Sequence, residues 1–225
     1  MLSDLMTDER LQVKICGMKR PEDAREAVRL GADAVGVIFA ESPRRVTADQ
    51  ARAVVAAARD EARTSGRAID VFGLFVNEHV DTIRELAREV GFDVAQLHGD
   101  ELPGIANELK GLRLVKAVRV KDLDSLHEIE RYWSTGWFEA MLLDAYSEKA
   151  RGGTGKTFDW AVAEKAVKTV RVILAGGLTP DNVREAVRRV QPAMVDVSSG
   201  VESSPGVKDH AKMKRFVEEA RSASR

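Results

Sequence analysis

Two residues that lie far apart in the sequence have the chemistry of an acid–base pair. Cys16, the only cysteine of the chain, ends the apolar run LQVKIC and is followed by a glycine and a helix start. Asp144 follows the apolar run AMLL. A thiolate and a carboxylic acid on opposite sides of a substrate could remove a proton from one atom and deliver a proton to another. Each residue also has a structural explanation, because buried cysteines pack as small hydrophobes and aspartates cap helices and loops.

The surroundings of Cys16 determine whether it is reactive. A thiolate forms when nearby positive charge or amide donors lower the pKa of the thiol. Lys14 has the same parity along the run as Cys16, so we expect both side chains on one face of a strand. Lys14 either supplies that charge or pairs with an internal carboxylate such as Asp196.

Three glycine-rich segments predict a phosphate site. They are RGGTGKT (151–157), AGGLTPDN (175–182) and SSGVESSPG (198–206), whose GVES could form a short helix. Glycine lets backbone amides approach an anion closely, and a helix N-terminus adds partial positive charge. A simple turn explains any one segment, but three segments after neighbouring strands favour a phosphate. The expected ligands are Gly153, Gly155, Gly176, Gly177, Ser199 and Gly200.

The elements that must position these residues follow a regular alternation. Short apolar runs rich in β-branched residues alternate with amphipathic stretches. Pro21 is placed for a first helical position, and Thr47 is placed to cap a helix with an alanine-rich face. The predicted strands are 11–16, 33–39, 70–76, 93–97, 113–118, 139–144, 170–175 and 193–198.

This alternation predicts an α/β fold. Strands joined by helices form right-handed crossover units and a parallel sheet. Eight such units without a composition break fit a closed (β/α)8 TIM barrel in a single domain over residues 11–225. We expect residues 1–10 to form a flexible extension, and residues 145–169 to form a long glycine-rich loop before a short helix. The active site of such a barrel lies at the C-terminal ends of its strands.

Composition excludes several classes of protein. The 225 residues have a formal net charge of −1, which favours neither nucleic acid nor an anionic membrane. One cysteine excludes an internal disulfide, and four histidines without paired spacing argue against a zinc site. No apolar run is long enough for a membrane span, and MLSDLMTDER does not resemble a signal peptide. We therefore expect a cytoplasmic protein.

Several segments are similar to those of one enzyme family. KICGMKRPEDA, SPRRVT, QLHGDE, LLDA, GGTGKTFDW, LAGGLTPDNV and VDVSSGVESSPGVKD resemble, in order, segments of the phosphoribosylanthranilate isomerases of tryptophan biosynthesis. The resemblance runs from about residue 12 to about residue 220. It implies an eight-stranded barrel without cofactor or metal, which acts on a small phosphorylated substrate as a monomer or a homodimer.

The resemblance also implies a reaction, the Amadori rearrangement of N-(5-phosphoribosyl)anthranilate in the third step from chorismate. Asp144 would be the general acid that protonates the furanose ring oxygen. Cys16 would be the general base that takes the proton from C2′. Arg44 would bind the anthranilate carboxylate, with its neighbour Arg45 as the alternative. The glycine segments would bind the phosphate.

Other residues keep two interpretations each. Asp196 could tune Cys16 or orient the substrate, or it could be a structural partner of Lys14. Gln96 and His98 share one strand face and could line the mouth of the barrel, or His98 could be structural.

Three other functions remain to be tested. A related barrel isomerase acts on a histidine-pathway aminoaldose, but that family has an aspartate where this chain has Cys16. The indole-forming synthase of the tryptophan pathway uses lysine and glutamate at strand ends, a pattern that is not found here. A barrel that only binds a phosphorylated ligand is the non-enzymatic alternative.

Overall fold

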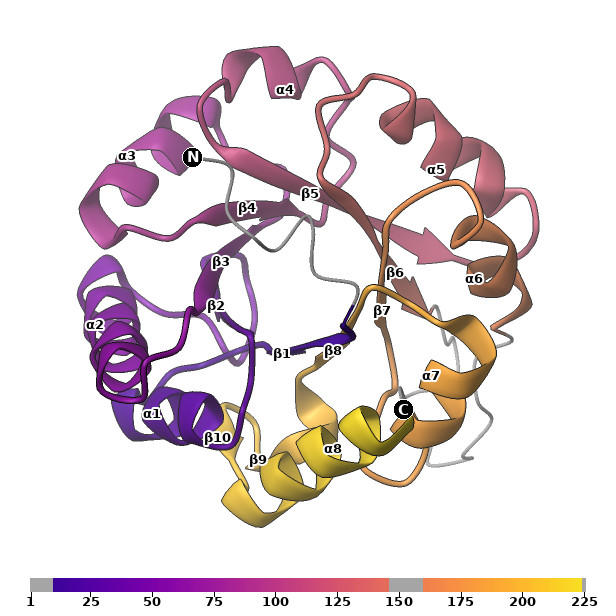
Figure 1. Ribbon diagram of the computed structural model, residues 1–225. Helices are drawn as coiled ribbons and strands as arrows, with labels where there is room; N and C mark the ends of the chain where they lie inside the picture. The colour runs from indigo at the N-terminus through magenta and orange to yellow at the C-terminus, as the bar shows by residue number, and fades with distance from the viewer. Residues whose placement is uncertain (1–9, 146–159, 224–225) are drawn as a thin grey trace.

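The computed structural model describes residues 10–145 and 160–223 of the chain. Its first eight strands form a closed barrel in the order β1 to β8, every adjacent pair is parallel, and β8 pairs with β1. Figure 1 shows the helices as a ring around these strands. This arrangement confirms the predicted eight-stranded parallel (β/α)8 barrel.

The predicted strands are all present, with small differences at their ends. The barrel strands are β1 (Gln12–Ile15), β2 (Ala34–Ile38), β3 (Asp70–Phe75), β4 (Val94–Leu97), β5 (Arg113–Val120), β6 (Ala140–Ala145), β7 (Val172–Ala175) and β8 (Met194–Val197). β5 runs two residues beyond its predicted end because the apolar alternation continues to Val120, which is buried. A small antiparallel pair that was not predicted, β9 (Glu202–Ser204) and β10 (Val207–Lys208), follows β8.

The helices lie outside the barrel. They are α1 (Pro21–Arg29), α2 (Ala48–Thr64), α3 (Val80–Val90), α4 (Ile105–Glu108), α5 (Ser125–Trp133), α6 (Ala161–Ala166), α7 (Val183–Val190) and α8 (His210–Ala223), with the 3-10 helix η2 (Ser199–Val201) after β8. Among the described residues, none of these helices is both long and apolar enough to cross a membrane.

Two predictions fall partly outside the described part of the chain. The structure does not describe residues 1–9 of the predicted extension (1–10), or residues 146–159 of the predicted loop region (145–169). The short helix predicted after that loop is confirmed, because α6 has six residues.

Local sequence explains where the helices begin and end. α1 begins at Pro21, whose fixed φ suits the first helical position. The Thr47 side chain caps α2 by accepting a hydrogen bond from the backbone N–H of Gln50. The Gln50 side-chain oxygen in turn accepts from the backbone N–H of Thr47. α3 ends at Gly91, which has a φ of 75° and therefore adopts the left-handed conformation that ends many helices.

The hydrophobic core has two layers. The larger layer fills the space between the barrel and the helices. The smaller layer fills the interior of the barrel, where Phe72, Leu142, Ile173 and Met194 meet small residues such as Ala34. This interior layer separates the two ends of the barrel, so the polar groups at each end form separate clusters.

Candidate active site

A cavity of about 300 Å³ opens at the C-terminal end of the barrel. Its residues come from the ends of the strands and the loops that follow them, which is where barrel enzymes carry their active sites. Most of the predicted site residues line it. These are Cys16, Arg44, Gln96, His98, Asp144, Gly176, Gly177, Asp196 and Ser199.

Cys16 follows β1 directly and is held between the two neighbouring strands. Its backbone N–H donates to the carbonyl oxygen of Val197 at 2.8 Å. Gly36 on β2 leaves the space that the thiol occupies, since a Cβ added to Gly36 would lie 2.7 Å from the Cys16 sulfur. The thiol is therefore positioned on the β8 side by the backbone hydrogen bond of Cys16, and on the β2 side by the space that Gly36 leaves.

Burial and nearby charges act in opposite directions on the pKa of Cys16. Burial raises the pKa of the thiol, the charges of Lys14 and Lys208 and the N–H of Gly17 lower it, and Asp196 raises it. The net result is a raised pKa, because burial outweighs the nearby cations. The thiolate, once formed, is a correspondingly stronger base.

Lys14 pairs with Asp196 inside the barrel. The two residues are opposite each other in the β1–β8 register, and the Lys14 Nζ lies 2.7 Å from the Asp196 Oδ2. Burial lowers the pKa of Lys14, but the charges of Asp196 and Cys16 and its hydrogen bonds to them outweigh burial and raise it. Both roles considered for Lys14 therefore apply, because it pairs with the carboxylate and also attracts a thiolate at Cys16.

A chain of hydrogen bonds continues from Lys14 across the mouth to Asp144. Lys14 donates to the Gln96 side-chain oxygen at 2.8 Å, which turns the Gln96 amide nitrogen toward His98 Nδ1 at 3.4 Å. The other ring nitrogen of His98 then carries the hydrogen and faces Asp144 Oδ2 at 3.3 Å. Gln96 and His98 thus join the cysteine side of the cavity to the aspartate side.

Asp144 lies at the opposite side of the barrel, near the end of β6. Its side chain is 33% exposed, so the carboxyl faces the cavity while the apolar residues before it are buried. His98 can stabilise the carboxylate that would remain after Asp144 gives up a proton.

The arginine pair of the SPRRVT segment divides between the cavity and the surface. Arg44 lines the cavity, whereas Arg45 is paired with Glu41 and its side chain is 61% exposed. The Arg44 guanidinium donates to both carboxylate oxygens of Glu202, at 2.8 and 2.7 Å. The Lys208 Nζ also donates to Glu202, at 3.0 Å.

The glycine segments after β7 and β8 lie against each other at the edge of the cavity. Gly176 and Gly177 have φ values of 80° and 67°, which glycine adopts without strain. Gly200 does not line the cavity, but a Cβ added there would lie 2.0 Å from the Leu178 carbonyl oxygen, so only glycine allows this contact. GVES forms a helix only in part, because η2 ends at Val201. Gly153 and Gly155 lie outside the described residues.

Two buried polar atoms at the cavity have no hydrogen-bond partner among residues 10–145 and 160–223. They are the Asp196 Oδ1 and the Ser198 Oγ, and both residues line the cavity. Unpaired buried polar atoms are costly, so they indicate a site where a ligand completes the bonding. In the described part of the chain, no cluster of histidine, cysteine, aspartate and glutamate is arranged to hold a metal ion.

Three residues of this site were not predicted from the sequence. All three follow β8. Ser198 and Glu202 lie within the segment 198–206 that was interpreted as phosphate-binding, and Lys208 lies two residues beyond it. Their charges and hydroxyl are visible in the sequence, but Glu202 and Arg44 are 158 positions apart, so nothing local indicated their pairing.

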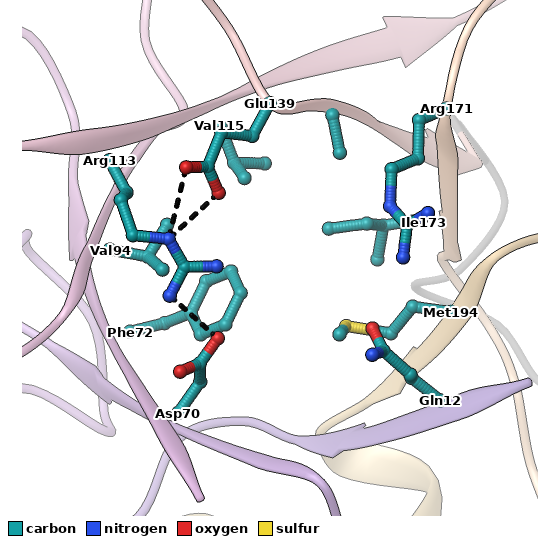
Figure 2. A pocket seen from close by; sticks show the side chains of 11 residues that line it. Gln12, Asp70, Phe72, Val94, Arg113, Val115, Glu139, Arg171, Ile173 and Met194 are labelled. Carbon is teal, nitrogen blue, oxygen red and sulfur yellow. Dashed lines mark hydrogen bonds and ion pairs between the residues drawn. The ribbon is translucent and has the colours of Figure 1, made fainter. Parts of the chain in front are cut away.

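The N-terminal end of the barrel has a much smaller cavity, lined by an arginine that is paired with two carboxylates. Figure 2 shows Arg113 between Asp70 and Glu139, with Arg171 on the far side of a small hollow. Arg113 donates to Asp70 at 2.8 Å and to Glu139 at 3.0 and 2.9 Å. The cavity there is only about 20 Å³, which is too small for a metabolite.

The chain is similar to known proteins over most of its length. The family model for N-(5'-phosphoribosyl)anthranilate (PRA) isomerase matches residues 13–219. The N-(5'-phosphoribosyl)anthranilate isomerase of Geobacter metallireducens is 48% identical over 212 residues, which cover 94% of this chain and 99% of that protein.

Two solved structures are also similar to the chain. The phosphoribosyl anthranilate isomerase of Thermotoga maritima is 36% identical, with a TM-score of 0.84 over 94% of this chain and 99% of that chain. A phosphoribosyl anthranilate isomerase in complex with reduced 1-(o-carboxyphenylamino)-1-deoxyribulose 5-phosphate is 33% identical, with a TM-score of 0.81 over the same shares. The motif resemblance is confirmed by these matches, and the chain belongs to the N-(5'-phosphoribosyl)anthranilate isomerase family.

Proposed function

We propose that the chain isomerises N-(5-phosphoribosyl)anthranilate to 1-(2-carboxyphenylamino)-1-deoxyribulose 5-phosphate in tryptophan biosynthesis, with Cys16 as general base and Asp144 as general acid. We further propose that residues 11–225 form one catalytic domain of a cytoplasmic enzyme that works as a monomer or a homodimer. Family membership supports the reaction, and the geometry of the cavity supports the residue roles.

The reaction balances with one acid and one base. Asp144 donates a proton to the ring oxygen, the bond from that oxygen to C1′ breaks, and the nitrogen lone pair forms a protonated Schiff base. The Cys16 thiolate then takes the proton from C2′, and the electrons of that bond form the double bond between C1′ and C2′ while nitrogen regains its lone pair. The resulting enol amine becomes the ketone when a proton moves from the 2′-hydroxyl to C1′.

One observation carries the proposal. Cys16 and Asp144 come from opposite sides of the barrel, β1 and β6, and both line the same cavity of about 300 Å³. A sugar between them would meet the base on one side and the acid on the other, as a proton transfer from one atom to another requires. The protonated Schiff base acidifies C2′, so a thiolate is a sufficient base.

The two anionic ends of the substrate match separate parts of the cavity. Arg44 supports binding of the carboxylate, since Arg45 points away into an exposed pair with Glu41. Gly176, Gly177 and Ser199 support binding of the phosphate at the edge formed after β7 and β8. Asp196 offers an oxygen, without a partner in the described part of the chain, that could accept from a sugar hydroxyl.

The test is turnover of N-(5-phosphoribosyl)anthranilate, followed by the fluorescence of the anthranilate group. We expect the wild-type enzyme to convert it, and Cys16→Ala and Asp144→Asn each to lower kcat by about 10²- to 10⁴-fold. Binding of the reduced product should survive in both variants, which separates loss of chemistry from loss of the site.

Near-normal rates in both variants would show that the residue roles are wrong. Activity of the wild-type enzyme on the histidine-pathway aminoaldose would show a broader specificity than we propose. A protein that binds the reduced product but never turns over the substrate would favour the non-enzymatic alternative.

A further inference from the structure

Glu202 holds the guanidinium of Arg44 at the edge of the cavity. Its two carboxylate oxygens accept from Arg44 Nε and Nη2 at 2.8 and 2.7 Å, which is a bidentate pair. Such a pair fixes the plane of the guanidinium as well as its distance. An arginine has five donor hydrogens, so the edge that includes Nη1 is left to face other groups.

Lys208 forms a charged cluster with Arg44 and Glu202, and contacts Glu202 from the protein interior. Its ammonium donates to Glu202 at 3.0 Å and to the Ser198 carbonyl oxygen at 3.1 Å, and its side chain is fully buried. The cluster holds two positive charges and one negative charge. Because Lys208 is buried and Arg44 lines the cavity, Arg44 is the cation of this cluster that a ligand in the cavity would contact.

The cluster is fixed relative to the catalytic cysteine. A Cβ added to Gly17 would lie 2.7 Å from Arg44 Cδ, so the arginine stem packs directly on the residue after Cys16. The backbone N–H of Lys208 donates to the carboxylate of Asp23 at 3.2 Å, which ties β10 to α1. Glu202 therefore orients Arg44 from a frame that also carries Cys16.

We propose that Glu202 is the positioning residue that fixes the orientation of Arg44 in the carboxylate subsite. The inference rests on the proposed function and extends it to a residue that does not touch the reacting atoms. Glu202 leaves one edge of Arg44 for the substrate, so its removal lets the guanidinium turn and the recognition of the carboxylate is lost.

The experiment compares two substrates in the wild-type enzyme and in Glu202→Gln. One is N-(5-phosphoribosyl)anthranilate, and the other is the aniline analogue without the carboxylate, made by condensing aniline with ribose 5-phosphate. We expect Glu202→Gln to lower kcat/KM for the carboxylated substrate by about 10- to 100-fold, mainly through KM. For the aniline analogue we expect a change within about threefold, and Glu202→Asp should restore part of the difference.

A matched control comes from the other end of the barrel. Glu139 accepts from the Nε of Arg113 with both of its oxygens, so Glu139→Gln also removes one carboxylate from a paired arginine. It should leave the ratio of the two kcat/KM values unchanged. If Glu202→Gln fails to fold, the double variant Glu202→Gln/Lys208→Met removes the unneutralised lysine as well, and the same ratio is measured.

Equal losses on both substrates would mean that Glu202 has only a structural role, and no loss would mean that Arg44 keeps its orientation without it; either result overturns the inference. Failure of the wild-type enzyme to turn over either substrate would instead overturn the proposed function.

Calorimetry with the two reduced products then tests Glu202 without turnover. The inference predicts weaker binding in Glu202→Gln only for the product with the carboxylate, and it fails if both products bind equally well in the variant and the wild type.

Discussion

The two ends of the barrel use the same kinds of side chain for opposite purposes. At the C-terminal end, Arg44 is paired with one carboxylate, Glu202, which it shares with Lys208. At the N-terminal end, Arg113 is shared by the two carboxylates of Asp70 and Glu139 (Figure 2). The first arrangement leaves surplus positive charge beside the cavity, whereas the second neutralises its arginine within the protein.

The two ends also differ in the size of their cavities and in their buried polar atoms. The C-terminal end encloses about 300 Å³ and the N-terminal end about 20 Å³. The two buried side-chain atoms without a partner in the described residues, from Asp196 and Ser198, both lie at the C-terminal end. A site that binds a ligand leaves bonds to be completed, and a site that only stabilises the fold completes them itself.

The largest effect should follow the loss of the buried cation at the C-terminal end. Lys14→Met leaves Asp196 buried without its partner, so we expect the free energy of unfolding to fall by about 3–5 kcal/mol. The charge of Lys14 lowers the pKa of Cys16, which burial has already raised. Its loss raises that pKa further, so the increase of kcat/KM with pH should move to higher pH. Urea titration and a pH–rate profile measure the two effects.

Lys14→Gln is the control for this prediction, because glutamine keeps a hydrogen-bond donor for Asp196 and removes only the charge. It should be more stable than Lys14→Met and show the same displacement of the pH profile. A profile that stays at the wild-type position in both variants would mean that Lys14 does not act on the thiol.

A smaller effect should follow the loss of the cation at the N-terminal end. Arg113→Met leaves two partly buried carboxylates side by side, so we expect a loss of about 1–3 kcal/mol in the free energy of unfolding. The kcat/KM should stay within about twofold of the wild type, because this end does not open into the catalytic cavity. A large loss of activity at unchanged stability would contradict the division of roles between the two ends.

The smallest effect concerns the pH dependence of Asp70. Burial raises the pKa of its carboxyl, although Arg113 opposes the shift. The folded state therefore binds this proton more tightly than the unfolded state, and the stability gained below the unfolded pKa is lost as the pH rises through the folded pKa. Asp70→Asn lacks this titration. Its stability should therefore rise relative to the wild type as the pH increases from below the unfolded pKa of about 3.9 through the raised folded pKa, as measured by urea titration.

The fold could be predicted because its signals are local. The alternation of apolar runs and amphipathic stretches predicted all eight barrel strands, and Pro21 and Thr47 marked the starts of α1 and α2. The pair of short strands β9 and β10 was missed, because a three-residue strand carries too little periodic pattern to be recognised.

The site could be predicted only in part. Strand parity placed Lys14 and Cys16 on one face, and the position of Asp144 near the end of β6 placed it at the same end of the barrel as Cys16. The direction of the Cys16 pKa shift could not be predicted, because it depends on how completely the thiol is buried. Gly36 could not be connected with Cys16 either, because their contact depends on the register between β1 and β2.

The sequence by itself determined which chemical groups this protein has and at which end of the barrel each one lies, because strand order and strand parity follow from the chain. Only the tertiary structure decided which of those groups pair with one another and which of them line the cavity. The choice of Arg44 over Arg45 for the cavity, the pairing of Arg44 with Glu202, and the chain of hydrogen bonds from Lys14 to Asp144 all join residues from different strands and loops. Such contacts depend on closure of the barrel, and closure brings together side chains whose separation along the sequence gives no sign that they will meet.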